Sequence, residues 1–252
     1  MDLTDADRRK YRRQMSLAGF GEPAQQRLKN SAALVARAGG LGGTVALYLA
    51  AAGIGRLTLL HGGTVTHTNL NRQVLMTADW VGKPRAEKLR ASLLAFNPDL
   101  VLTVIPENPN DANLGEQAGR VDILCDCPPT FEERFALNRA SVRHRKPMIE
   151  AAMNGMEAHL TVLVPGRTPC LQCLYPEPPP DWSGTTFPVL GAVSGAVACL
   201  AAIEAIKVLT GFGKPLVGQM LVFDTECHEY RKYKVHRNPA CSVCGHLCMK
   251  GT

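Results

Sequence analysis

The fold is decided by one stretch of the sequence, Ala32-Ala33-Leu34-Val35-Ala36-Arg37-Ala38-Gly39-Gly40-Leu41-Gly42-Gly43. Its apolar part has the length of a β-strand and ends at Arg37, four glycines then follow within five residues, and residues 44–52 have the composition of a helix. The free N–H groups and the dipole of a helix N-terminus attract anions, and glycines let the backbone approach a phosphate closely. The stretch therefore predicts a phosphate-binding turn. The alternative is a tight strand-to-helix turn that binds nothing, and Arg37 stands where a dinucleotide fingerprint would have its first glycine.

The composition fits a protein that has a substantial hydrophobic core and binds an anion. The chain has 252 residues, of which 46% are hydrophobic, and a net charge of +6. This length suits one large α/β domain or two small ones. The mild positive charge favours anionic ligands such as nucleotides, or an acidic partner, and no basic run is dense enough to predict nucleic-acid binding.

The sequence gives no sign of export or membrane insertion. The first residues, Met1-Asp2-Leu3-Thr4-Asp5, are polar and acidic rather than signal-like. The longest uncharged apolar stretch, residues 189–203, is too short to span a bilayer, and Glu204 and Lys207 close it. We therefore expect a cytoplasmic chain with no membrane partner, whose nine cysteines serve metal or redox roles rather than disulfides.

Strands and helices alternate through the first 150 residues. The strands expected after the first are 56–61, 101–105, 121–126 and 147–150, and the helices are 5–17, 22–29, 44–52, 82–96 and 131–143. Alternation of this kind predicts an α/β fold with an open, mostly parallel, doubly wound sheet of the Rossmann type.

The pattern changes after residue 150. A strand at 158–164 is followed by a proline-rich loop at 165–184, a long apolar helix at 189–209, and two strands at 219–224 and 229–235. We interpret this part as a C-terminal antiparallel extension, so that residues 1–252 form a single domain.

Two cysteine pairs predict a metal centre. Cys170-x-x-Cys173 and Cys241-x-x-Cys244 are about seventy residues apart, and each tight turn brings two sulfurs to one side, so that two turns complete the tetrahedron of a structural zinc site. Such a closed site would pin the proline-rich loop to the C-terminal segment. The alternative is two unrelated exposed pairs.

The order of the motifs along nearly the whole chain resembles one family, the E1-like adenylyltransferases of the MoeB/ThiF/HesA superfamily. The motifs are Arg13-Gln14, Gly39-Gly40-Leu41-Gly42, Asn69-Leu70-Asn71-Arg72-Gln73, Asp126-Cys127, Pro169-Cys170, Cys173-Leu174, Glu204-Ala205-Ile206-Lys207 and Cys241-Ser242-Val243-Cys244-Gly245. Gly62-Gly63, Glu150-Ala151-Ala152-Met153 and Val189-Leu190-Gly191 make the resemblance strongest to the HesA branch, the form associated with nitrogen-fixation gene clusters.

The resemblance implies a reaction. MgATP binds at the glycine turn, and the C-terminal glycine carboxylate of a small ubiquitin-like sulfur carrier attacks the α-phosphate. An acyl adenylate and pyrophosphate result, and the activated carbonyl then receives sulfur for cofactor assembly, with nitrogenase cofactor maturation as one destination.

The resemblance also implies roles for individual residues. Arg72 corresponds to the phosphate-binding arginine, and Arg13 to an arginine that reaches into the neighbouring subunit's site, which implies a homodimer. An ordinary surface role is the alternative for each arginine. The residues implied to contact the nucleotide are Gly39, Gly40, Gly42, Asn69 and Arg72.

Several family positions carry other residues in this chain. The ribose-binding aspartate is His61, the aspartate two residues later is Gly63, and the catalytic lysine is Arg85. A cation is kept at 85, but a point charge becomes a planar fork. Lys83 is a second candidate for the missing lysine.

The magnesium position differs as well. Pro129-Thr130 replaces the Asp-Asn pair that supplies the magnesium ligand, and Asp126 is the candidate substitute. Three hypotheses follow: an ATP-dependent adenylyltransferase, a catalytically degenerate dimeric scaffold of the same pathway, and a dinucleotide-dependent oxidoreductase. The third is supported only by the glycines, because no acidic residue ends the second strand to hold a ribose.

Overall fold

The computed structural model describes residues 1–180, 182, 184 and 186–247. One eight-stranded sheet runs through it in the order β3-β2-β1-β4-β5-β6-β7-β8. Its strands are β1 Ala32–Ala36, β2 Arg56–Leu60, β3 Val101–Ile105, β4 Ile123–Asp126, β5 Met148–Asn154, β6 Glu157–Leu163, β7 Gln219–Asp224 and β8 Glu229–Lys234. The five strands from β3 to β5 are parallel, and β6, β7 and β8 are added antiparallel. The predicted fold class, with its antiparallel extension, is confirmed.

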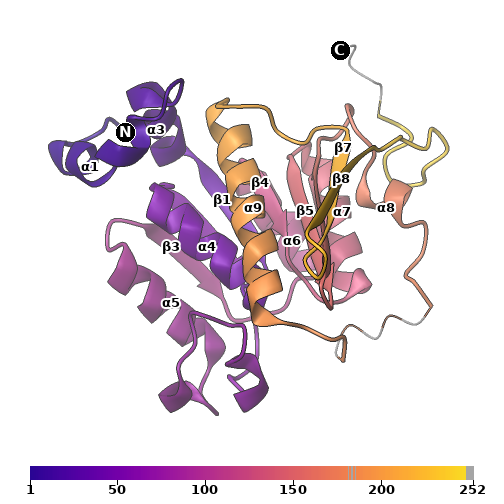
Figure 1. Ribbon diagram of the computed structural model, residues 1–252, viewed down its shortest axis with the longest axis horizontal. Coiled ribbons are helices and arrows are strands. Elements are labelled where there is room, and N and C mark those ends of the chain that lie inside the picture. The colour runs from indigo at the N-terminus through magenta and orange to yellow at the C-terminus, as the bar shows by residue number, and fades with distance from the viewer. Residues whose placement is uncertain (181, 183, 185, 248–252) are drawn as a thin grey trace.

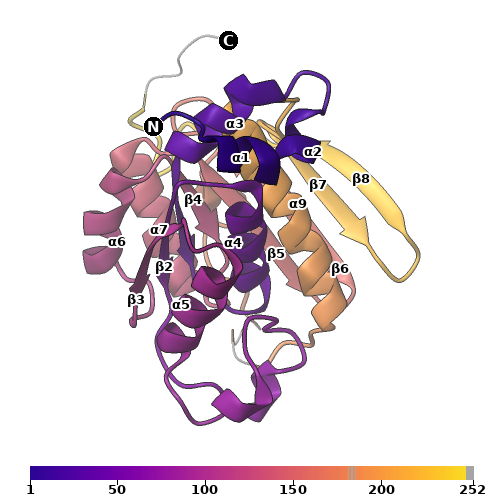
Figure 2. The same ribbon diagram turned by 90° about the vertical axis from the view of Figure 1, so that its left-hand side faces the viewer.

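Helices cover both faces of the sheet (Figures 1 and 2), with α4 and α9 on one side and α6 and α7 on the other. The helices are α1 Asp5–Lys10, α2 Arg12–Met15, α3 Gly21–Asn30, α4 Gly40–Ala52, α5 Arg85–Phe96, α6 Asp111–Gln117, α7 Phe131–His144, α8 Leu171–Leu174 and α9 Gly191–Thr210. Strand β1 is buried along its whole length. Successive strand residues point to opposite faces, so Ala33 and Val35 join one core cluster while Leu34 and Ala36 join the other.

Some element boundaries differ from those expected. Helix α4 begins at Gly40 rather than 44, because the glycines themselves form its first turn. The expected helix at 5–17 is broken at Tyr11 into α1 and α2. Helix α6 was not expected; the side chain of Asn110 caps it by accepting from the backbone N–H of Ala112 and Asn113. Helix α8 lies inside the expected loop and is the turn between Cys170 and Cys173.

Helix α9 lies close to the helix expected at 189–209 and extends beyond the uncharged apolar stretch at 189–203. Over its 20 residues it has the length and apolar composition of a membrane-spanning helix, and 44% of the tested window is buried. It packs against α4, β5 and β6, and Val193, Val197 and Ala201 belong to the main core cluster. We interpret α9 as a core helix that keeps one apolar face exposed.

Candidate active site and metal centre

A cavity of about 510 Å³ opens at the carboxyl ends of β1, β2 and β4. Open α/β sheets bind ligands in this crevice, where the chain leaves the central strands in opposite directions. Arg37 and Gly39 follow β1, His61 follows β2, and Cys127 follows β4. The far end of the cavity is walled by Ala151, Ala152, Met153, His159, Tyr175, Trp182 and Phe187.

The glycine turn needs its glycines for close approach. A Cβ on Gly40 would lie 2.9 Å from Cγ of Arg72, and one on Gly42 would lie 2.5 Å from the carbonyl oxygen of Arg37. Arg37 itself has a left-handed φ of 64°, and its carbonyl accepts from the N–H of Gly39 at 2.7 Å. The turn therefore brings the N-terminus of α4 against the side chain of Arg72.

Arg85 is held in the cavity by four hydrogen bonds. Its Nη1 donates to His61 Nε2 at 2.7 Å and to the carbonyl of Gly62 at 3.2 Å. Its Nη2 donates to the carbonyl of Thr64 at 2.7 Å and to Asn69 Oδ1 at 2.8 Å. All four acceptors are uncharged, and no described carboxylate lies within 4.0 Å of Arg85. Its charge is therefore held in place without being neutralised.

Two more guanidinium groups share this end of the cavity. Arg72 Nη1 donates to the carbonyl of Thr68 and to Asn71 Oδ1, both at 2.8 Å. Arg37 donates to Asn108, which follows β3, and its Nε lies 3.6 Å from Glu133 Oε1. Arg37 thus ties together the segments that follow β1 and β3 and the start of α7.

His61 is neutral in this setting. Burial, followed by the charges of Arg85 and Arg37, lowers the pKa of His61 to about 3. Because Arg85 has donors only, Nε2 of His61 accepts its hydrogen bond and the ring proton lies on Nδ1. Burial also lowers the pKa of Arg85, and the charges of Arg37 and Arg72 act in the same direction.

A buried ionic network lies beneath the far end of the cavity. Arg134 of α7 binds Asp126 of β4 at 3.0 Å and also Glu150 of β5. His159 of β6 is 2.9 Å from Glu150, and Tyr175 Oη is 3.3 Å from the same His159 nitrogen. Burial raises the pKa of Asp126 to about 6. Burial acts the same way on Glu150, but His159 and Arg134 outweigh it and lower the pKa of that carboxyl.

The cavity brings together most of the predicted nucleotide residues. Those that line it are Gly39, Gly40, His61, Asn69, Arg72 and Arg85. Gly42 lies one turn into α4. Lys83 is exposed and its Nζ sits 4.9 Å from the ring centroid of Trp80, and Arg13 is exposed on α2. The structure brings neither of these two into the cavity, nor Asp126, which is fully buried against Arg134.

Several residues that line the cavity are not predicted by the sequence. The sequence marks Arg37 only as a departure from a glycine fingerprint, yet its side chain lines the cavity. Arg134 and His159 gave no motif signal, because they meet through pairings between α7, β5 and β6 that are distant in sequence. Trp182, whose indole donates to the carbonyl of Pro129 at 2.7 Å, lies in the proline-rich loop, and its aromatic character was the available signal.

The described donor set does not fit a magnesium ion at the phosphate end. Mg²⁺ prefers carboxylates and water. Within the described ranges Glu157 is the one carboxylate that lines the cavity, on β6, while Asp126 is bound to Arg134 and Glu133 lies beside Arg37. The described residues at this end therefore offer magnesium no carboxylate ligand.

The four cysteines form a cluster with the dimensions of a zinc site. All four sulfurs lie within 4.8 Å of one another, and the separations Cys170–Cys241 and Cys173–Cys244 are 3.7 and 3.5 Å. A tetrahedral Zn²⁺ with Zn–S bonds of about 2.3 Å places its sulfurs about 3.8 Å apart. The cluster can therefore hold zinc, joining α8 to the segment after β8.

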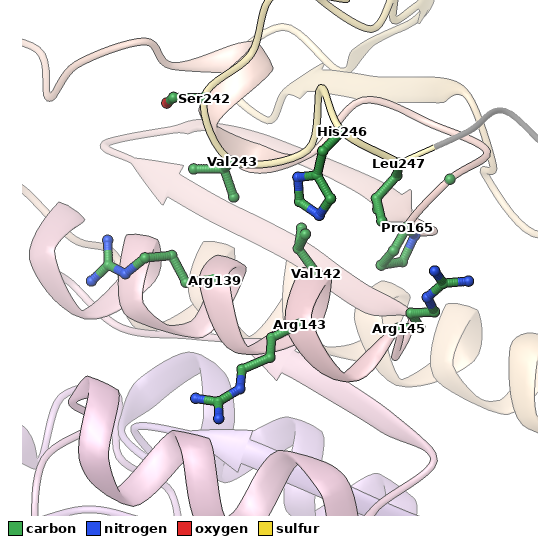
Figure 3. A pocket seen from close by; sticks show the side chains of 10 residues that line it. Arg139, Val142, Arg143, Arg145, Pro165, Ser242, Val243, His246 and Leu247 are labelled. Carbon is green, nitrogen blue, oxygen red and sulfur yellow. The ribbon is translucent and has the colours of Figure 1, made fainter.

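A second hollow, of about 700 Å³, lies between α7 and the second cysteine turn. Figure 3 shows Val142, His246 and Leu247 around its middle, whereas the guanidinium groups of Arg139, Arg143 and Arg145 are directed outward. Arg139 is also paired with Asp111 at 2.7 Å. The middle of the hollow is therefore formed by two apolar side chains and one imidazole, without the converging guanidinium groups of the first cavity.

Comparison with known proteins identifies the family. The family model described as the ThiF family matches residues 11–243. The chain belongs to the ThiF family. A heterocyst HesA protein of Trichormus variabilis is 51% identical over 245 residues, covering 97% of this chain and 91% of that protein. The predicted E1-like adenylyltransferase family, with its stronger likeness to HesA, is thereby confirmed.

More distant ThiF relatives carry an activity in their names. The adenylyltransferase and sulfurtransferase MOCS3 of Drosophila virilis is 38% identical over 247 residues, which cover 96% of this chain and 55% of that protein. This chain therefore spans about half the length of MOCS3.

The fold also matches solved structures. E. coli MccB with MccA-N7isoASN has a TM-score of 0.82 at 26% identity, covering 95% of this chain and 75% of that one. E. coli MccB with ATP has a TM-score of 0.76 at 27% identity, covering 88% and 68%.

Proposed function

We propose that this ThiF-family chain is an ATP-dependent adenylyltransferase that activates the C-terminal carboxylate of a small protein or peptide. The observation that carries the proposal is that one cavity has two ends of different chemistry. One end has the glycine turn and three guanidinium groups, which suit a triphosphate. The other has small and aromatic residues, which suit an extended chain end.

The reaction follows from this arrangement. A carboxylate oxygen attacks the α-phosphorus, the bond from that phosphorus to the bridging oxygen breaks, and pyrophosphate leaves. Negative charge grows on the leaving group beside Arg72 and Arg85, and preorganised donors stabilise such charge without reorganising. His61, being neutral, adds no charge of its own at the end of β2.

The far end of the cavity favours a slender substrate. Ala151 and Ala152 form its wall on β5, and Tyr175, Trp182 and Phe187 stand around them. A C-terminal glycine segment, as in a ubiquitin-like sulfur carrier, has no side chains to clash with such a channel. Supporting this class, MccB is a structural neighbour solved with MccA-N7isoASN, and MOCS3 is named as an adenylyltransferase and sulfurtransferase.

We also propose a homodimer. Four large apolar side chains are about half exposed or more: Tyr48 of α4, Val74, Leu190 just before α9, and Ile203 of α9. Burying such surface against a second copy would be favourable. Arg13 would then enter the partner's cavity, as the family resemblance implies. The link to sulfur transfer and nitrogenase cofactor assembly rests on the resemblance alone and stays a prediction.

Pyrophosphate exchange tests the proposal. The zinc-loaded protein is incubated with ATP, labelled pyrophosphate and ubiquitin-like carriers ending in Gly-Gly, and label appearing in ATP is measured. We expect exchange that depends on the carrier's free C-terminal carboxylate and is lost on Arg72→Ala. The same carriers with an amidated C-terminus are the matched control. Absence of exchange and of ATP binding would leave the scaffold hypothesis.

A further inference from the structure

The phosphate end of the cavity carries an excess of positive charge. Arg37, Arg72 and Arg85 all line it. In the described part of the chain the single carboxylate close to any of them is Glu133, 3.6 Å from Arg37. His61 contributes no charge of its own, because it is neutral at physiological pH. Two formal positive charges therefore remain without a carboxylate partner.

These cations are held in place before any ligand arrives. Arg85 donates to four fixed acceptors. The stem of Arg72 lies against Gly40, where even a Cβ would not fit, and its guanidinium donates to the carbonyl of Thr68 and to Asn71 Oδ1. Arg37 is anchored through Asn108, whose Oδ1 also accepts from the N–H of Gly62 at 3.1 Å.

Such an arrangement can neutralise the charge of a triphosphate, which is otherwise done by a divalent cation. Guanidinium forks pair with phosphate oxygens in two parallel hydrogen bonds, and fixed positive charge stabilises a pyrophosphate leaving group. A divalent cation here would instead be repelled by three guanidinium groups and would find no free carboxylate among the described residues at this end.

Building on the adenylyltransferase function proposed above, we propose that Arg37, Arg72 and Arg85 together bind the triphosphate of ATP in its metal-free form. Arg37, at a position where a glycine would serve the turn, is then a specificity-determining residue for free ATP over MgATP. Its left-handed φ is the backbone cost of placing a third cation there.

Calorimetric titration compares the two forms of the nucleotide. The zinc-loaded protein is titrated with ATP in buffer freed of divalent ions by a chelating resin, which leaves the protein's zinc in place, and again with excess Mg²⁺ at equal ionic strength. We expect the Kd without Mg²⁺ to be lower than the Kd with it. A Kd without Mg²⁺ that is equal to or higher than the Kd with it overturns this inference and leaves the proposed function standing. Absence of binding in both buffers overturns both.

A substitution at Arg37 adds a second readout. Glycine at position 37 suits the left-handed backbone. We expect Arg37→Gly to weaken the binding of free ATP at least tenfold and the binding of MgATP less than threefold. Arg143→Ala removes an equal charge outside the cavity and should change neither the affinity for free ATP nor the affinity for MgATP. Equal losses of free ATP and MgATP in Arg37→Gly would overturn the role of Arg37. Arg37→Lys keeps the charge, and its affinity for free ATP should lie between those of the unmodified protein and Arg37→Gly. It is the variant to use if Arg37→Gly folds poorly.

Discussion

The hydrogen bond between Arg85 and His61 links the charge of the cavity to the stability of the fold. The pKa of His61 is about 3 in the folded protein and about 6.5 in an unfolded chain. Between these values the unfolded state binds more protons, so stability rises with pH. The contribution is complete above about pH 6.5 and is lost as pH falls toward 3.

His61→Gln should flatten this pH dependence. Glutamine offers an acceptor to Arg85 but does not titrate. From pH 6.5 down to 4, we expect the free energy of unfolding in urea to fall more steeply in the unmodified protein, by up to about 1.4 kcal/mol per pH unit. Above pH 7 the two curves should run parallel. Parallel curves over the whole range would mean that folding does not lower the pKa of His61.

At this scale the sequence predicted part of the site. Gly39, Gly40, Asn69, Arg72 and Arg85 stand in motifs near the strand ends, and strand ends meet at one edge of the sheet. The burial of Asp126 against Arg134 could not be predicted, because it depends on the depth at which α7 packs on β4. Lys83 and Arg85 are only two positions apart in the sequence. Which of the two side chains enters the cavity depends on the residue at which α5 begins.

Among the elements, the N-terminus of α9 controls the position of Arg72. A Cβ on Gly191 would lie 2.1 Å from the carbonyl oxygen of Asn71 and 3.2 Å from Cα of Arg72. The loop that carries Arg72 is therefore pressed directly on the first turn of α9. Gly195, one turn further along the same helix, has nothing within 4 Å of its added Cβ.

Gly191→Ala should displace Arg72 and weaken ATP binding at least tenfold, whereas Gly195→Ala should leave binding unchanged. Calorimetric titration of both variants with ATP measures the effect. Thermal unfolding provides the check on folding, because alanine is favoured over glycine in a helix interior by about 0.5–1 kcal/mol. Equal ATP affinity in the two variants would contradict the contact described here.

The order of strands and helices was largely predictable, since alternating apolar segments and glycine turns mark it. Helix α6 was missed because its main signal is a local cap, Asn110, rather than a long apolar period. The break of the first helix at Tyr11 was missed because that side chain is buried near Gly53, a tertiary contact that the local pattern does not contain.

For the whole molecule, the cysteine cluster joins segments 71 residues apart. We expect metal removal by a chelator to lower the thermal midpoint by about 5–10 °C, since each kcal/mol lost shifts the midpoint of a chain this long by about 2–4 °C. Cys241→Ser should do the same. Cys227→Ser, at an exposed site outside the cluster, is the control. An unchanged midpoint in protein proven metal-free would contradict a structural zinc.

The proposed dimer depends on the exposed apolar face of α9. Ile203→Asp places a charge in that face, and we expect it to shift the protein toward monomer in light scattering and to reduce pyrophosphate exchange. Phe96→Asp, on the equally exposed end of α5, should leave the oligomeric state unchanged. A mass unaffected by Ile203→Asp would place any self-association elsewhere.

The proposed function requires that the cavity bind ATP through the glycine turn and its arginines. The most direct test is calorimetric titration of the zinc-loaded protein with ATP, beside Arg72→Ala. We predict binding in the micromolar range that is weakened at least tenfold in the variant. No binding up to millimolar ATP, or equal binding by the variant, would contradict an ATP site in this cavity.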